Sequence, residues 1–401
     1  MTQTIQQPGR WLTAQLIAVS ALAPFGMHLI IPAIAPIRSA FGISSSTASL
    51  MISATLAGIA VATLFFGLLA DRFGRRPMLL GGSVLYVAGS VMGIVGQTAE
   101  MVIAGRVIQG IGGAAGIVIA RAVIRDLYHH EKATSVLAYL TMAVMVAPIM
   151  APAFSGFLVG SFGWRAVFEV AGAAGVAVLV WVAWTFRETL REPVPMPDLA
   201  ALIGAYMTVL RSPVFTLYTM AGSFVMVSFF GMMSGVPYVA HDAWHIPPDR
   251  LGFYLGAGGL GMMMSAGITA RLAERVDHDK LMLAGYLSIL VGVVGSTSLF
   301  AAGVNHPLSL FGPVVLNGFG AGFVLPTTTS RALSATPRMT GTAAGMMTFI
   351  QFAFGTVAAQ AAGAFDHHTV WPVIGFIIVG NGMSAVFAFI AIARRRRKGA
   401  S

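Results

Sequence analysis

Apolar residues occur along the chain in blocks of about 20, and each block ends in charged residues, proline or glycine. Blocks of that length cross the hydrocarbon core of a bilayer as α-helices, whereas membrane strands alternate apolar and polar residues, and no stretch here does so. The pattern predicts twelve membrane-spanning helices, at residues 11–37, 47–70, 78–97, 101–124, 134–160, 166–187, 213–240, 250–273, 281–302, 307–333, 340–364 and 370–393.

Composition agrees with this pattern, because 57% of the 401 residues are hydrophobic and only 9% are charged. We therefore expect an all-α integral membrane protein. The chain contains no cysteine, which excludes disulfide and thiol chemistry. It also lacks a Gly-x4-Gly-Lys-Ser/Thr phosphate loop, so we expect no nucleotide motor, no enzyme activity and no cofactor.

Positive charge is unevenly distributed among the expected loops. With a cytoplasmic N-terminus, the cytoplasmic ends of the spans hold all of the 24 Lys and Arg residues except Arg38, Arg106, Arg165 and Arg250. We expect both termini in the cytoplasm and a bacterial inner membrane as the location. The net charge of +10 then reflects topology, and no nucleic-acid partner is expected.

The most polar connection follows the sixth span and contains Pro193, Pro195 and Pro197, which oppose a continuous helix. It divides the chain into an N-terminal six-helix bundle (1–187), a cytoplasmic linker (188–212) and a C-terminal six-helix bundle with a basic tail (213–401). A weak repeat supports this division, because Gly67-Leu-Leu-Ala70 recurs as Gly267-Ile-Thr-Ala270.

The loop after the second span combines Asp71 with three arginines, Arg72, Arg75 and Arg76. The arginines obey the positive-inside rule, but an acid in a basic loop serves no topological purpose. Gly67 lets another helix approach, and Asp71 can accept hydrogen bonds from a neighbouring helix N-terminus and its arginines. These residues predict a latch that closes the cytoplasmic side. A simple stop-transfer loop is the alternative for Arg75 and Arg76.

The fifth span places Pro148, Pro152 and Gly156 on one face, four residues apart. Each proline removes a backbone hydrogen bond and bends the helix, and small residues permit close packing. The pattern predicts a kinked helix in tight contact with a neighbour.

Several motifs together resemble one family. They are Gly67-x3-Asp71-Arg72-x-Gly74-Arg75-Arg76, Arg106-x2-Gln109-Gly110, Arg121-x3-Arg125-Asp126-Leu127-Tyr128, Ala147-Pro148-x3-Pro152-x3-Gly156, Gly163-Trp164-Arg165-Ala166-x-Phe168 and Glu188-Thr189-Leu190. Over essentially its whole length the chain resembles the major facilitator superfamily, and within it the drug:proton antiporters of the bicyclomycin and chloramphenicol resistance (Bcr/CflA) type.

The resemblance implies the major facilitator fold, in which two six-helix bundles surround a central cavity. It also implies export of small, mostly hydrophobic compounds by alternating access with proton-coupled antiport, and a fifth-span motif that seals the passage and pivots between states. A dedicated exporter of one metabolite, such as a peptide, siderophore or amino acid, is the alternative. A membrane sensor that binds ligand without transporting it is a second alternative.

The sequence departs from the family in its first span. The resemblance implies an aspartate four residues before a proline, but the segment reads His28-Leu-Ile-Ile-Pro32. A histidine titrates near neutral pH, so we expect His28 to carry the coupled proton and to contact substrate. The alternative is a neutral histidine hydrogen-bonded within the bundle.

Two further residues are candidates for proton coupling. Arg106 lies well inside the fourth span, where it either snorkels to the periplasmic surface or faces the cavity and hydrogen-bonds across the halves. Glu169 lies at the start of the sixth span. An interfacial ion pair with Arg165, four residues earlier, is its alternative role.

Depth along each span gives the remaining candidates for substrate contact. Methionine and aromatic side chains form an adaptable apolar wall, and the chain has 23 methionines. The candidates are Gln109, Met226, Phe230, Tyr238, Met262, Asn317, Gln351 and Phe352.

His241 and His245 have a spacing that suits a metal on a helix, but they border Pro247-Pro248, and we expect no metal site. The expected partners are a small-molecule substrate, protons and membrane lipid, and the protein is expected to be a monomer.

Overall fold

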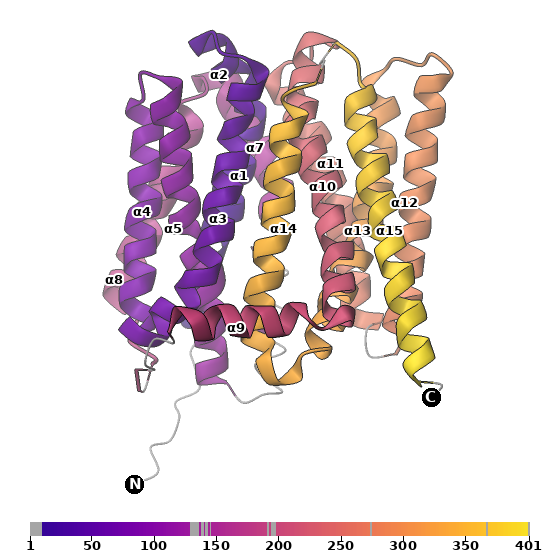
Figure 1. The fold of residues 1–401 in the computed structure, drawn as a ribbon. Helices are drawn as coiled ribbons and strands as arrows, with labels where there is room; N and C mark the ends of the chain where they lie inside the picture. The colour runs from indigo at the N-terminus through magenta and orange to yellow at the C-terminus, as the bar shows by residue number, and fades with distance from the viewer. Residues whose placement is uncertain are drawn as a thin grey trace.

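The computed structural model describes residues 10–128, 136, 137, 140, 143, 144, 146–190, 192, 193, 198–272, 275–365 and 368–399. These residues form helices and loops with no strand among them, so the all-α expectation is confirmed (Figure 1). In chain order the elements are α1 (Arg10–Leu29), the 3-10 turn η1 (Ile31–Ala33), α2 (Ile34–Phe41), α3 (Ser45–Phe73), α4 (Arg75–Val95), α5 (Ala99–Leu127), α7 (Val146–Phe162), α8 (Ala166–Thr185), α9 (Leu199–Leu210), α10 (Pro213–Asp242), α11 (Pro248–Leu272), α12 (His278–Ala301), α13 (Pro307–Ser334), the 3-10 turn η2 (Pro337–Met339), α14 (Thr340–Ala362) and α15 (Trp371–Gly399).

Eleven helical segments in the described part of the chain are long and apolar enough to cross a membrane. The expected spans agree with them to within a few residues at most ends. The twelfth, expected at 134–160, corresponds to the shorter apolar helix α7, and much of its first part lies outside the described residues. Large apolar side chains such as Phe157, Leu287 and Val357 are more than half exposed, as expected of helices that face lipid rather than water.

The first span differs from the continuous helix expected over 11–37. A 3-10 turn at Ile31–Ala33 separates α1 from α2, and the helical path continues to Phe41. Pro32 lies in this turn and cannot donate a backbone hydrogen bond, which explains the break. Gly42 ends α2 in the left-handed conformation, with φ of 60°.

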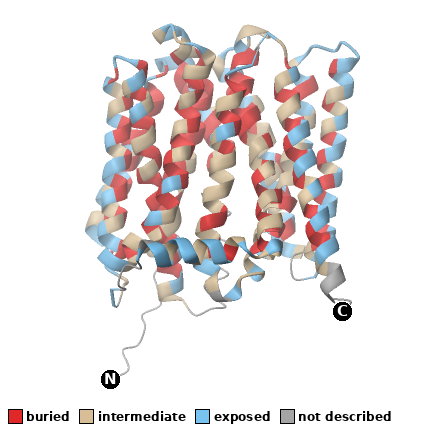
Figure 2. Ribbon diagram, in the orientation of Figure 1, coloured by how far each residue is buried: buried red, intermediate tan, exposed pale blue. Residues whose placement is uncertain are grey.

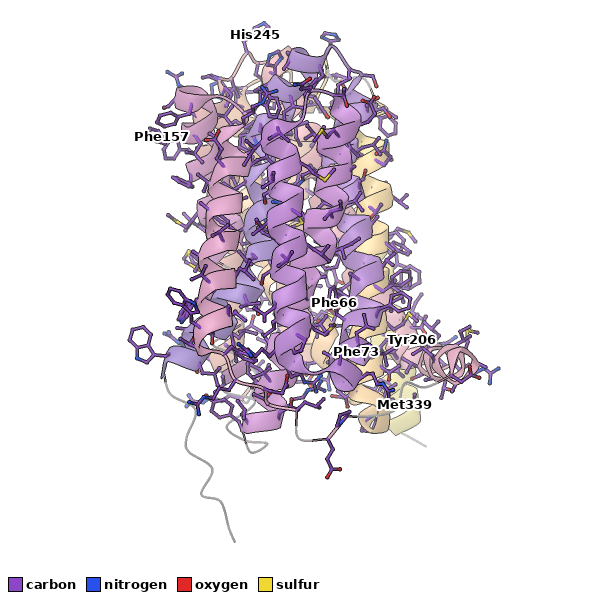
Figure 3. The ribbon with its side chains drawn as sticks, turned by 90° about the vertical axis from the view of Figure 1, so that its left-hand side faces the viewer. Phe66, Phe73, Phe157, Tyr206, His245 and Met339 are labelled. Carbon is purple, nitrogen blue, oxygen red and sulfur yellow. The ribbon has the colours of Figure 1, made fainter. Side chains whose placement is uncertain are left out.

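The linker contains a helix that the prolines did not lead us to expect. Asp198 is the N-cap of α9, which lies across the end of the bundle that carries both termini (Figure 1). The hydroxyl of Tyr206 donates to the carbonyl oxygen of Leu64 on α3, 3.2 Å away, while Val209 is buried among second-half residues. Figure 3 shows Tyr206 at the same end as Phe73 and Met339, and His245 at the opposite end. The helix therefore contacts both halves.

Helices α1, α3, α4, α5, α7 and α8 pack together, and we call this group the first half. Helices α10 to α15 pack together as the second half. The two groups meet along α7 with α11 and along α3 with α14. Buried residues concentrate where helices face one another, and exposed residues lie on the outer faces (Figure 2). We call the surface along which the two groups meet the seam.

Candidate functional site

A cavity lies between the two groups of helices, near their mid-height. His28 of α1 and Pro148 of α7 line it from the first half, and residues of α10, α11, α13 and α15 form the rest of its wall. It contains about 760 Å³ of empty space, counting the part open to the outside. The part wide enough for a water-sized sphere measures only about 70 Å³. The wall is mostly apolar and rich in methionine, with Met232, Met233, Met262 and Met263.

His28 is the polar group that the first half contributes to the cavity. Its Nδ1 lies 2.7 Å from the carbonyl oxygen of Pro24, one helical turn earlier, and the ring packs 6.0 Å from that of Phe229. The side chain is only 3% exposed, and Nε2 has no hydrogen-bond partner among the described residues. The carbonyl oxygen of Pro24, which lies inside α1, thus fixes the orientation of the imidazole.

Three polar residues of the second half lie in the same cavity: Ser228, Asn317 and Asn381. Asn381 donates from Nδ2 to the Ser228 hydroxyl and to the Ile377 carbonyl oxygen, both at 2.9 Å. Asn317 donates weakly to the carbonyl oxygen of Pro313 at 3.4 Å, and its Oδ1 is buried without a partner in the described structure. Asn381 was not predicted from the sequence. The signal was present, because Asn381 is a single amide within an apolar span, as Asn317 is, and it lies between two glycines.

Arg106 does not snorkel, because it is only 1% exposed. Its guanidinium donates to the carbonyl oxygens of Met51 and Gly26, each at 3.1 Å, and to Oε1 of Gln109. These partners lie on α3, α1 and α5, so the arginine connects helices within the first half. The expectation that Arg106 forms hydrogen bonds across the halves is therefore wrong as well. Gln109 in turn donates to Ser90 at 2.8 Å.

The other predicted contact residues lie outside the cavity wall except Met262 and Asn317. Phe230 is buried between the rings of Phe229 and Phe352, at 5.1 and 6.2 Å. Gln351 lies against Gly222, and Met226 is partly buried beside the core. Tyr238 is buried near one end of the seam between the halves.

Glu169 and Arg165 do not form an ion pair in the described structure, so the alternative role of Glu169 is wrong. Arg165 donates to the carbonyl oxygens of Ile94 and Gly96 and packs over the ring of Trp164 at 4.1 Å. Glu169 is exposed, away from the cavity wall. The last carbonyl oxygens of α4 have no partner within their own helix. This explains why Arg165 donates to them rather than pairing with Glu169.

Helix α7, which contains Pro152, packs against glycines of α11. A Cβ at Gly156 would lie 2.4 Å from the carbonyl oxygen of Pro248, and one at Gly252 would lie 2.3 Å from that of Pro152. Only glycine fits at such separations. The predicted face of the fifth span is therefore a tight contact between the halves, and Pro148 at its other end reaches the cavity.

Polar contacts join the halves at the end away from the termini. Tyr238 donates to the carbonyl oxygen of Ser45 at 3.0 Å, and Ser53 donates to Gln360 at 2.7 Å. Arg38 of α2 and Asp242 of α10 form an ion pair there. Together these contacts close that end of the seam.

The loop motif bonds within the first half. Asp71 pairs with Nη1 of Arg75 at 2.6 Å, and Nε of Arg75 pairs with Asp126 at 3.0 Å. Arg72 is exposed, and Arg76 donates to the carbonyl oxygen of Ala183. Arg75 is the first residue of α4, so Asp71 does accept from an arginine at a neighbouring helix N-terminus. The cluster holds α3, α4 and α5 together within the first half.

Glu188 completes this cluster, a role that sequence reasoning did not assign. Its carboxylate accepts from the backbone N–H groups of Arg75, Arg76, Thr189 and Leu190, at 2.9 to 3.0 Å. Partial burial acts to raise the pKa of Glu188, but these four bonds outweigh it and hold the pKa below its usual range. Gly74 allows this approach, with φ of 102° and a Cβ position only 2.5 Å from Glu188 Oε2.

The second half contains a related cluster at its corresponding loop. Arg331 pairs with Asp277 at 3.0 Å and with Asp279 at 3.1 Å, and Arg395 lies 3.2 Å from Asp279. Burial acts to raise the pKa of Asp277, but the Asp279 N–H and the two arginines lower it. The weak sequence repeat thus coincides with a repeated acid–arginine arrangement.

His241 binds Asp242 through Nδ1 at 2.7 Å, and His245 has a positive φ of 50° at the turn after α10. No group of three metal-ligating side chains occurs in the described ranges.

Comparisons with known proteins agree with this architecture. The chain is 27% identical over 371 residues to the chloramphenicol resistance protein of Pseudomonas aeruginosa, covering 89% of this chain and 85% of that protein. It is 24% identical over 396 residues to multidrug resistance protein D of Escherichia coli, covering 96% of each. It is also 24% identical to the bicyclomycin resistance protein homolog of Haemophilus influenzae, over 95% of each chain.

Solved structures show the same fold. A D-xylose-proton symporter superposes with a TM-score of 0.74 at 15% identity, covering 94% of this chain and 96% of that one. A bacterial homolog of the human lysosomal transporter Spinster, in an inward-facing and unoccupied conformation, gives 0.72 at 16% identity over 95% and 96%. The sequence profile of the Major Facilitator Superfamily matches residues 16–360, and the chain belongs to that family.

Proposed function

We propose that this protein exports small, mostly hydrophobic compounds, drugs among them, from the cytoplasm by alternating access in exchange for protons. The observation that carries the proposal is the apolar cavity at mid-height between two helix groups, with polar contacts across the seam at one end. The relatives named for resistance to chloramphenicol, bicyclomycin and multiple drugs support the choice of cargo.

The proposed location is a bacterial inner membrane with both termini cytoplasmic, which follows from the distribution of positive charge. In that orientation the closed end of the seam faces the periplasm. The protein would act as a monomer, because each chain contains both halves and the cavity between them.

We assign the coupled proton to His28, the titratable group in the cavity wall. Arg106 would assist indirectly, since it binds the carbonyl oxygen of Gly26 two residues earlier on α1. Glu169 is a weaker candidate because it is exposed. The membrane potential supplies about 2.3 kcal/mol per charge per 100 mV, so one or two protons are enough for modest accumulation.

Everted vesicles from a host without its own efflux pumps test the proposal. Vesicles containing the protein should accumulate radiolabelled chloramphenicol when energised, and collapse of the proton gradient should release it. A panel of unrelated drugs should compete with it. Transport of a single metabolite without drug competition would favour the dedicated exporter, and ligand binding without any transport would favour the sensor.

A further inference from the structure

Two hydrogen-bond acceptors in the cavity wall have no partner among the residues that the structure describes, and they come from opposite halves of the protein. They are Nε2 of His28 on α1 and Oδ1 of Asn317 on α13. A buried acceptor without a partner costs about 1–3 kcal/mol, so such atoms call for an explanation. We propose that these two atoms anchor the transported compound, and that they select uncharged compounds that donate hydrogen bonds. The inference rests on the proposed function and specifies its substrate class.

The hydrogen-bond network fixes the tautomer of His28. The carbonyl oxygen of Pro24 can only accept, so Nδ1, 2.7 Å away, carries the hydrogen. In a neutral imidazole the other nitrogen is then an acceptor. Nε2 of His28 can therefore bind a hydroxyl or an N–H of a ligand, but it has no hydrogen to offer to a carbonyl group.

The amide of Asn317 is oriented in the same way. Its Nδ2 faces the carbonyl oxygen of Pro313, which excludes the flipped orientation because two oxygens would then face each other. Oδ1 remains as an acceptor. Of the other polar side chains of the wall, Asn381 donates to the Ser228 hydroxyl at 2.9 Å, and His28 Nε2 and Asn317 Oδ1 are the fully buried polar atoms of the described wall without a partner.

Charge excludes another class of cargo. Among the described residues, no carboxylate lines the cavity, and the remaining wall consists mainly of methionine, aromatic, aliphatic and glycine residues such as Phe229, Met232 and Met262. A permanent cation entering this space would lose its hydration without gaining a counter-charge, which is unfavourable. Flexible methionines accommodate different apolar shapes, so the two acceptors provide orientation rather than a narrow fit.

The same geometry makes substrate and proton compete. Protonation of His28 converts Nε2 from an acceptor into a donor, so a ligand hydroxyl and a proton require the same lone pair. No charged side chain of α7, α10, α11, α13 or α15 lines the cavity beside it, and the guanidinium of Arg106 on α5 is bound to Gly26 on α1. Mutual exclusion at one atom is sufficient for exchange without a second binding site.

Binding to the purified protein in lipid nanodiscs tests the selection directly. The probes are chloramphenicol, which has two hydroxyls and an amide N–H, its diacetyl ester, which lacks both hydroxyls, and the cation tetraphenylphosphonium. We expect the ester to bind about tenfold more weakly than chloramphenicol, and no saturable binding of tetraphenylphosphonium.

Variants at Asn317 then test whether its side chain causes the preference for uncharged hydrogen-bond donors. N317L keeps the size of the side chain but removes the acceptor, and should weaken chloramphenicol binding by about two- to tenfold while hardly changing the ester. N317D should gain tetraphenylphosphonium binding, a result that a misfolded protein cannot give. Ser296→Ala is the control, since Ser296 is buried on α12 and bonds only to its own helix.

Three results would overturn the inference: no binding of chloramphenicol, equal affinity for chloramphenicol and its ester, or saturable binding of tetraphenylphosphonium to the unmodified protein. Transport of other drugs in everted vesicles would remain intact in each case if the proposed export is correct. Loss of transport for every drug tested would instead contradict the proposed function itself.

Discussion

Arg38 and Asp242 join the two halves of the protein through a bidentate ion pair. Nη1 of Arg38 lies 2.8 Å from Oδ2 of Asp242, and Nη2 lies 2.6 Å from Oδ1. Arg38 also donates to the Ser45 hydroxyl and lies 5.4 Å from the centre of the Tyr238 ring. The pair is partly exposed, at 19% and 15%, so it can separate into water when that end of the protein opens.

We expect Arg38→Ala to shift the protein toward the state that is open at this end. A partly exposed bidentate pair contributes about 1 kcal/mol, which changes the ratio of the two states by about fivefold. Spin labels on cysteines placed at the ends of α2 and α10 would measure the change in distance, and the natural chain has no cysteine to interfere.

Reversal of the pair is the control for this prediction. Arg38→Asp combined with Asp242→Arg should restore the closed population at least in part, whereas either change alone should not. Unchanged distance distributions in the single variants would show that the ion pair does not stabilise closure.

The contact between α7 and α11 gives a second prediction. Gly156→Leu adds a side chain where even a Cβ would lie 2.4 Å from the Pro248 carbonyl oxygen, so the halves can no longer approach. We expect drug transport to fall to background while the protein still folds and binds ligand. Gly160→Ala on the same helix is the matched control, because its added Cβ would meet only the Cβ of Asp249 at 3.8 Å. Normal coupled efflux by Gly156→Leu would refute this role.

Glu188 predicts a pH-dependent contribution to stability. A carboxyl whose pKa is lower in the folded than in the unfolded protein stabilises the fold above its unfolded-state pKa, and that contribution disappears as pH falls through the folded-state pKa. Glu188→Ala should cost about 1 kcal/mol at neutral pH, as the loss of a helix N-cap does. The melting temperatures of the two proteins in detergent should converge at low pH. A difference that stays constant from neutral to acidic pH would be inconsistent with the cap.

The regular parts of the fold could be predicted because the membrane requires them. Blocks of about 20 apolar residues have few alternatives to spanning helices, and α3, α5 and α13 begin and end close to the predicted positions. The 3-10 turn at Pro32 was not predicted, because a proline within an apolar run leaves both a kink and a break open. Helix α9 was missed because the proline-rich segment before it dominated the interpretation of the linker.

The site was predictable only in part. His28, Met262 and Asn317 line the cavity as expected, whereas Phe230 and Gln351 do not, since depth along a span does not determine which way a side chain points. Two of the partners of Arg106, Gly26 on α1 and Met51 on α3, are distant from it in sequence. Such contacts depend on tertiary packing, which hydrophobic periodicity does not encode.

Asp71 gives a fourth prediction, about the latch. In the present conformation Asp71 binds Arg75 of the same half, and its side chain is 44% exposed. If it also binds a helix of the other half when the cytoplasmic side closes, Asp71→Asn should lower the rate of transport several-fold without reducing expression or ligand affinity. Arg72→Gln is the matched control at an exposed neighbour. Transport at the wild-type rate by Asp71→Asn would leave only the bond to Arg75 within the first half as a role for the acid.

The last prediction concerns His28 and the proton. Because the imidazole is the titratable group that lines the cavity, His28→Ala should abolish accumulation driven by a pH gradient and the proton release that substrate induces from the purified protein. His28→Asp should retain both, with a pH profile displaced to lower pH, since a carboxylic acid loses its proton more readily than an imidazolium. Glu169→Gln is the comparison: if this variant loses proton release while His28→Ala keeps it, the proton belongs to Glu169. If neither change affects accumulation, the exchange ion is not a proton, and transport must be facilitated or linked to another cation.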